Sequence, residues 1–250
     1  MAQTAAHAYI SVLLRKKFSY RKWFFPAFLL GSILPDIDYF FSKIHEIANI
    51  PSYLSFLNKT FAHSIISAII IYLLLLIVHE IKKDKNIIHL ANGLIIGLFL
   101  HISIDILFFL EKIDLFWPLP IKAIYLIDIN IPTYIYKSTL ALEFVFFRWF
   151  AYYAINMILH HPGKNKNLIK IQTFWMKIEL YFTMIFIICL YYLEIKNTLI
   201  IFYIGYIPSM IMMLYTIIKI WDSLDYFSKK IIINKESENI KERDNLININ

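Results

Sequence analysis

Residues that can bind a metal interrupt the most apolar stretches of this chain. They are His7 in "TAAHAYI", Asp36 and Asp38 in "LPDID", His63 in "TFAHS", and His101 and Asp105 in "HISID". Ionisable groups in apolar surroundings are costly, and inside membranes they are usually functional. Imidazoles and carboxylates together suit a borderline divalent cation. Their types therefore predict a metal site for zinc first, and for manganese or iron next.

Such a donor set also indicates hydrolytic chemistry. Three or four protein ligands leave a position open for water, and a spare carboxylate can act as general base. We predict five ligands, which are His7, Asp36, His63, His101 and Asp105. Asp38 or Glu143 is then the base, or a group that orients a ligand.

The composition of the chain indicates that this chemistry takes place in a membrane. Of the 250 residues, 59% are hydrophobic and 17% are charged, and the mean hydropathy is +0.60. The net charge is +7, but the basic residues stand in short groups between apolar runs, where a membrane explains them. Nucleic acid is therefore not an expected partner. The only cysteine, Cys189, lies in an apolar run, so a thiolate site is excluded.

The apolar runs predict the elements that position the site. Five are long enough to cross a hydrocarbon core as helices: residues 61–79, 91–110, 140–160, 173–194 and 198–220. Before them, residues 4–14 and 22–41 are expected to form a helical hairpin around a basic turn. We predict an all-α polytopic membrane helical bundle over residues 1–221, followed by a polar C-terminal tail over residues 222–250.

Basic clusters predict the orientation of these helices. Lys and Arg follow alternate runs, in "RKKFSYRK", "KKDK", "GKNK" and "SKK", and the positive-inside rule places those turns in the cytoplasm. A helix entering at Lys22 then reaches Asp36 about 21 Å across. His63, His101 and Asp105 fall at a similar depth from neighbouring runs. We expect the site to face the external side.

One helical face carries two of the candidate ligands. Gly93, Gly97, His101 and Asp105 recur every four residues and form a stripe. The glycines permit close contact with a neighbouring helix, so the stripe should deliver an imidazole and a carboxylate to that interface.

Two readings without catalysis remain open. The polar groups can simply pair, Asp105 with Arg148 or histidines with backbone carbonyls, which would leave a membrane scaffold. A cation transporter would also gather carboxylates, but it normally needs access from both sides.

In these motifs the sequence resembles the YdjM type of bacterial membrane-bound metal-dependent hydrolases. That family has an N-terminal histidine, "LPDxD", "HRGxTHS", "HxxxD", a Trp-Pro element and a later glutamate. The corresponding parts here cover roughly residues 1–145 and include Trp117 in "FWPL" and Glu143. The chain departs from the family at Asn58, which replaces the first histidine of "HRGxTHS" and is a poor zinc ligand.

The resemblance implies an inner-membrane hydrolase. It implies substrate contacts at Asn58, Ser64 and Trp117. The motif order is also distantly similar to the ligand order of zinc-dependent phospholipase C and P1-type nucleases, which suggests a membrane-associated ester or phosphoester as substrate.

Overall fold

The computed structural model describes residues 3–37, 61–107, 115–119, 132–163 and 165–230. Every regular element in these ranges is helical. Two short helices, α1 (Thr4–Leu14) and α2 (Phe24–Gly31), are each followed by a 3-10 turn, η1 (Arg15–Lys17) and η2 (Leu34–Asp36). The long helices are α4 (Ile65–Lys82), α5 (Lys85–Leu107), α6 (Thr133–His160), α7 (Lys166–Tyr192) and α8 (Ile195–Lys219). The predicted all-α class is confirmed.

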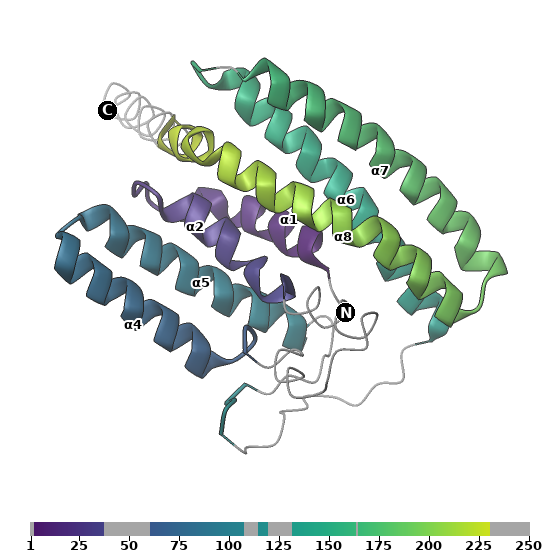
Figure 1. Ribbon diagram of the computed structural model, residues 1–250, viewed down its shortest axis with the longest axis horizontal. Helices are drawn as coiled ribbons and strands as arrows, with labels where there is room; N and C mark the ends of the chain where they lie inside the picture. Colours follow the sequence, from purple (N-terminus) through teal and green to yellow (C-terminus); the bar gives the residue numbers. More distant parts are fainter. Residues whose placement is uncertain (1–2, 38–60, 108–114, 120–131, 164, 231–250) are drawn as a thin grey trace, which may run out of the picture.

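The helices form two groups with α1 between them. In one group α5 packs against both α2 and α4, and in the other α6 packs against both α7 and α8. Helix α1 contacts α6 as well as α2 and α5. Figure 1 shows α4 and α5 along one side of the bundle, α6 and α7 along the other, and α1, α2 and α8 in the middle.

Several observed helices do not begin or end where the predicted apolar runs do. Helix α6 begins at Thr133 and α7 at Lys166, each seven residues before its apolar run. Helical hydrogen bonding continues past the hydrocarbon into polar turns, which a hydropathy criterion does not count. Helix α2 is shorter than its predicted run 22–41, because it ends at Gly31 just before "SILPD", where Pro35 cannot continue an α-helix.

All five long helices are apolar and long enough to cross a membrane. Helix α4 is the clearest case, since most of its surface is not covered by protein. Its large exposed apolar side chains are Ile69, Ile70, Leu73, Leu74, Ile77, Val78 and Ile81. A soluble protein rarely leaves such a face in water, whereas acyl chains cover it readily. The chain is a multi-pass membrane protein.

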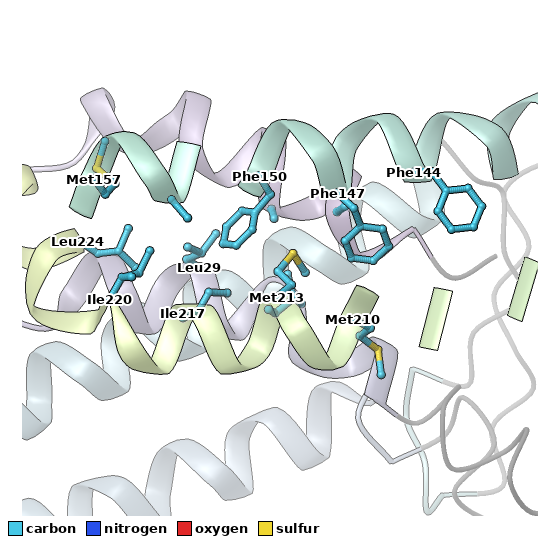
Figure 2. Close-up of a cluster of buried hydrophobic side chains, with 14 of the residues drawn as sticks. Leu29, Phe144, Phe147, Phe150, Met157, Met210, Met213, Ile217, Ile220 and Leu224 are labelled. Atoms are coloured by element: carbon cyan, nitrogen blue, oxygen red, sulfur yellow. The ribbon is translucent and has the colours of Figure 1, made fainter. Parts of the chain in front are cut away.

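The main apolar core lies between α6 and α8. Figure 2 shows Phe147 and Phe150 of α6 directed toward Met213 and Ile217 of α8, with Leu29 of α2 beside them. These side chains are almost fully buried. The core therefore fixes α8 against the helices that carry the N-terminal part of the chain.

The turns rich in Lys and Arg lie at one end of the bundle. The α1–α2, α4–α5 and α6–α7 turns and the helical residues 221–230 gather on the left of Figure 1. Residues 222–230, the start of the expected polar tail, are helical. Asp225 there accepts hydrogen bonds from Tyr20 Oη (3.1 Å) and Trp23 N (2.8 Å) of the α1–α2 turn. Burial and the Asp225 carboxylate raise the pKa of Tyr20 to about 12, so its hydroxyl stays protonated and donates.

Candidate metal centre

A close contact between α2 and α5 positions His101 and Asp105. A Cβ atom on Gly93 would lie 2.2 Å from the carbonyl oxygen of Phe24, and one on Gly97 would lie 2.2 Å from that of Phe28. Only hydrogen fits in these gaps, so the two backbones touch along the stripe. The predicted interface is confirmed. One turn further along α5, His101 Nδ1 lies 2.8 Å from the carbonyl oxygen of Ser32.

Helix α1 carries His7 and is held at its N-terminus from two sides. The Glu143 carboxylate of α6 accepts hydrogen bonds from Ala5 N (2.7 Å) and Ala6 N (3.4 Å). These are among the N–H groups that a helix leaves without internal partners, and they favour a negative charge. The Thr4 hydroxyl is bonded to Tyr206 Oη of α8 at 2.5 Å. Glu143 therefore fixes the helix on which His7 lies.

Ser64 and Asp36 mark the ends of the elements that enter the site. Ser64 Oγ caps α4 by accepting from Ile66 N (3.1 Å), and it donates to the carbonyl oxygen of Trp117 (2.7 Å). It thereby places the adjacent His63 and joins α4 to residues 115–119. Asp36 closes η2 after α2, and its Oδ2 atom accepts no hydrogen bond from any described residue.

The five predicted ligands converge in one buried cluster. His7 Nε2 lies 3.0 Å from Asp105 Oδ1, while His101 Nε2 and His63 Nε2 lie 3.2 and 3.5 Å from Asp105 Oδ2. His101 Nε2 is also 3.3 Å from His63 Nε2 and 3.9 Å from Asp36 Oδ1. None of these side chains is more than 3% exposed. The shared depth predicted for them is confirmed.

Backbone carbonyls determine how two of the imidazoles face the cluster. His7 Nδ1 lies 2.8 Å from the carbonyl oxygen of Gln3, as His101 Nδ1 does from that of Ser32. A carbonyl oxygen only accepts, so each Nδ1 carries a proton, and the Nε2 atom of each ring faces the cluster, where the neutral tautomer would present a lone pair. Metal-binding histidines are usually oriented in this way.

The same geometry needs positive charge among the ligands. Two buried aspartates face three imidazoles, and no Lys or Arg in the described ranges forms an ion pair with either carboxylate. Neutral Nε2 lone pairs held 3.2–3.5 Å from a carboxylate oxygen repel it. Either protons on the imidazoles or one divalent cation would remove this repulsion.

The distances also fit a cation. Atoms bound at 2.0–2.2 Å around a tetrahedral zinc lie about 3.3–3.6 Å from one another, and the contacts within the cluster are 3.0 to 3.9 Å. Two groups could hold an ion, His7 with His101 and Asp105, and Asp36 with His63 and His101. Both use His101, whose single Nε2 lone pair binds one ion. The groups therefore describe one site.

The other candidate residues have varied positions. Asp38 and Asn58 lie outside the described residues. Trp117 is half-buried and packs edge-on against Phe61, with ring centroids 5.8 Å apart. Arg148, a possible partner of Asp105, instead donates to the carbonyl oxygen of Met176.

Sequence reasoning missed the groups that orient the ligands. The carbonyl oxygens of Gln3 and Ser32 carry no side-chain signal. Tyr206 is one of 17 tyrosines, and nothing in its neighbourhood marks it as the partner of Thr4. Only the spacing of Gln3 and His7, four residues apart on one helical face, hinted at a local hydrogen bond.

Comparison with protein families shows which family the chain belongs to. The family model of the YdjM inner membrane proteins matches residues 2–221. The chain belongs to the YdjM inner membrane protein family. The match runs past residue 145, where the recognisable motifs end, and includes α6, α7 and α8. No curated protein and no solved structure matches the chain.

Membership in the YdjM family agrees with the helices and supports a place in the inner membrane. The residues matched by the YdjM model include α8. Tyr206 of α8 is bonded to Thr4 of α1, the helix that carries His7. The buried histidines and aspartates of this YdjM protein could hold a metal ion.

Proposed function

We propose that this YdjM protein is a metal-dependent hydrolase that acts on a membrane-associated ester or phosphoester. The observation that carries the proposal is the convergence of three imidazole Nε2 atoms and two carboxylates in one buried cluster. The resemblance of the ordered motifs to membrane-bound hydrolases adds the reaction class, and the distant likeness to phospholipase C and P1-type nucleases adds the phosphoester.

The donor set favours zinc, with manganese or iron as alternatives. Imidazole nitrogen with carboxylate oxygen and no thiolate is typical of catalytic rather than structural zinc sites. When bound, such an ion acidifies water and polarises a carbonyl or phosphoryl oxygen. The carbonyl oxygens of Gln3 and Ser32 hold two imidazoles in the required tautomer.

The remaining residues have distinct proposed tasks. Asp38 follows Asp36 by two residues and is the proposed general base. Glu143 is bonded to the N-terminus of α1, which supports its orienting role over the role of base. Asn58, Ser64 and Trp117 are the proposed substrate contacts. The Ser64 hydroxyl donates to the carbonyl oxygen of Trp117, which joins the start of α4 to residues 115–119.

The proposed site opens toward the external side. It lies at the N-terminal ends of α1 and α4 and the C-terminal end of α5, opposite the basic turns. The positive-inside rule places those turns in the cytoplasm. A substrate at this depth is a lipid or a lipid-linked headgroup. A transporter is less well supported, because the candidate ligands gather at one end of the bundle.

Metal analysis of the purified full chain tests the proposal. We expect about one zinc, manganese or iron ion per chain and chelator-sensitive release of phosphate or headgroup from a lipid phosphoester. Asp105→Asn preserves shape and should remove most of the metal. His160→Ala is the control, because His160 is exposed at the end of α6.

Two results would contradict the proposal in different ways. Wild type that folds without stoichiometric metal would leave a scaffold in which protons balance the aspartates. Bound metal without turnover of any lipid ester would favour binding or transport of the cation.

A further inference from the structure

Arg15 is a buried cation at the end of the bundle opposite the metal cluster. Its side chain is only 6% exposed, and no described carboxylate forms an ion pair with it. Nη1 donates to Tyr153 Oη at 2.8 Å, and the guanidinium carbon lies 4.9 Å from the ring centres of both Phe25 and Phe227. Two aromatic rings therefore stabilise the guanidinium through cation–π contacts.

One edge of this guanidinium is left without partners. Nε and Nη2 are buried and make no hydrogen bond to any described residue. Together they form the planar fork that binds two oxygens of a phosphate or carboxylate at once. A buried guanidinium with two unmet donors is costly, so the fold retains a group that an oxyanion would satisfy.

A small cleft lies against Arg15. Ser19, Arg21 and Ser228 contribute polar groups to its lining, and Phe18 and Phe25 contribute apolar walls. Its volume of about 10 Å³ is room for about one oxygen-sized group. Asp225 forms no ion pair with Arg15, and its two oxygens accept from Tyr20 and Trp23.

We propose that the Arg15 cleft binds the phosphate group of an anionic phospholipid. The cleft has room for one phosphate oxygen beside Arg15, while the rest of the headgroup stays outside it. Arg21 lines the cleft, and Lys16, Lys17 and Lys22 stand in the same turn of the chain. Such basic turns attract anionic lipids and disfavour a headgroup that carries its own cation. The phenylalanine walls suit the glycerol and upper acyl chain. This proposal does not depend on the metal cluster or on hydrolysis.

Lipid titration of the purified full chain tests the site. We expect phosphatidylglycerol, but not phosphatidylcholine, to remain bound in native mass spectrometry and to raise the melting temperature. Arg15→Lys keeps the charge and loses the fork, so it should weaken phosphatidylglycerol binding about tenfold. Ser19→Phe keeps Arg15 and adds bulk to the lining of the cleft, so it should cause a similar loss.

The matched control is Lys82→Gln, which removes an exposed charge at the end of α4, outside the turn that carries Arg15, and should change binding less than twofold. Equal binding by wild type, Arg15→Lys and Ser19→Phe would overturn the site. Stabilisation of the wild type by inorganic phosphate alone, with no retained lipid, would overturn the headgroup as the source of the phosphate.

Discussion

At the scale of single residues, the cluster depends on groups that hydrogen-bond to the candidate ligands, or to the helix that carries them, on the side away from the cluster. His7 and His101 are positioned through Nδ1 by carbonyl oxygens, and α1 itself is held by a carboxylate of α6. These contacts turn flexible imidazoles into fixed donors before any ligand arrives, which is what a tight and selective cation site requires.

Glu143→Gln should weaken the site without removing a ligand. An amide has one acceptor oxygen and no charge to offer the N-terminus of α1, so the loss is about 1.5–3 kcal/mol of stability. We expect a lower melting temperature and reduced metal content. Glu194→Gln is the control, because Glu194 precedes α8 without capping it through its side chain. Native stability and metal with no turnover would identify Glu143 as the base instead.

The convergence of the five candidate ligands was predictable because they are polar residues in apolar runs. His101 and Asp105 were also assigned to the right interface, since a repeat of four residues defines one face of a helix. The contact of Glu143 with α1 was not predictable. Those residues lie 138 positions apart, and no local pattern shows which helix end will lie beside which carboxylate.

At the scale of elements, the contact between α2 and α5 determines whether His101 meets Asp36. The backbones are close enough that the carbonyl oxygens of α2 occupy the space of missing side chains on α5. The helix boundaries were less predictable than the helices themselves. Apolar runs mark where lipid covers a helix, while hydrogen bonding and Pro35 decide where it ends.

Gly97→Ala should separate α2 from α5. The new Cβ would lie 2.2 Å from the carbonyl oxygen of Phe28, so the helices must move apart and His101 loses its contact with Ser32. We expect about 1–3 kcal/mol of destabilisation and loss of bound metal. Gly163→Ala is the control, since a Cβ there meets only the His161 side chain at 3.4 Å. Unchanged metal content would show that this contact does not build the site.

At the scale of the whole molecule, the basic turns and the candidate metal site lie at opposite ends of the bundle. The basic turns, with Arg15 in η1, lie at one end, and the N-terminal ends of α1 and α4 and the C-terminal end of α5, which carry the imidazoles and Asp105, lie at the other. This separation was predictable from the alternation of basic turns with apolar runs. The division into two helix groups around α1 was not, because it depends on which helices pack.

Cysteine labelling tests the proposed orientation. In a Cys189→Ser background, Leu119→Cys should react with a membrane-impermeant maleimide in intact cells, because Leu119 is exposed near the cluster. Lys83→Cys, in the exposed turn between α4 and α5, should react only after the membrane is opened. The reverse pattern would place the cluster on the cytoplasmic side.

The bond between Thr4 and Tyr206 spans 202 positions of the chain, and this has a consequence for biogenesis. Helix α1 acquires this partner only after α8 has been synthesised and inserted. Until then α1, which carries His7, lacks the hydrogen bond from Thr4 to Tyr206. The centre is therefore completed late in synthesis, and a truncated chain that stops before α8 cannot assemble it as the full chain does.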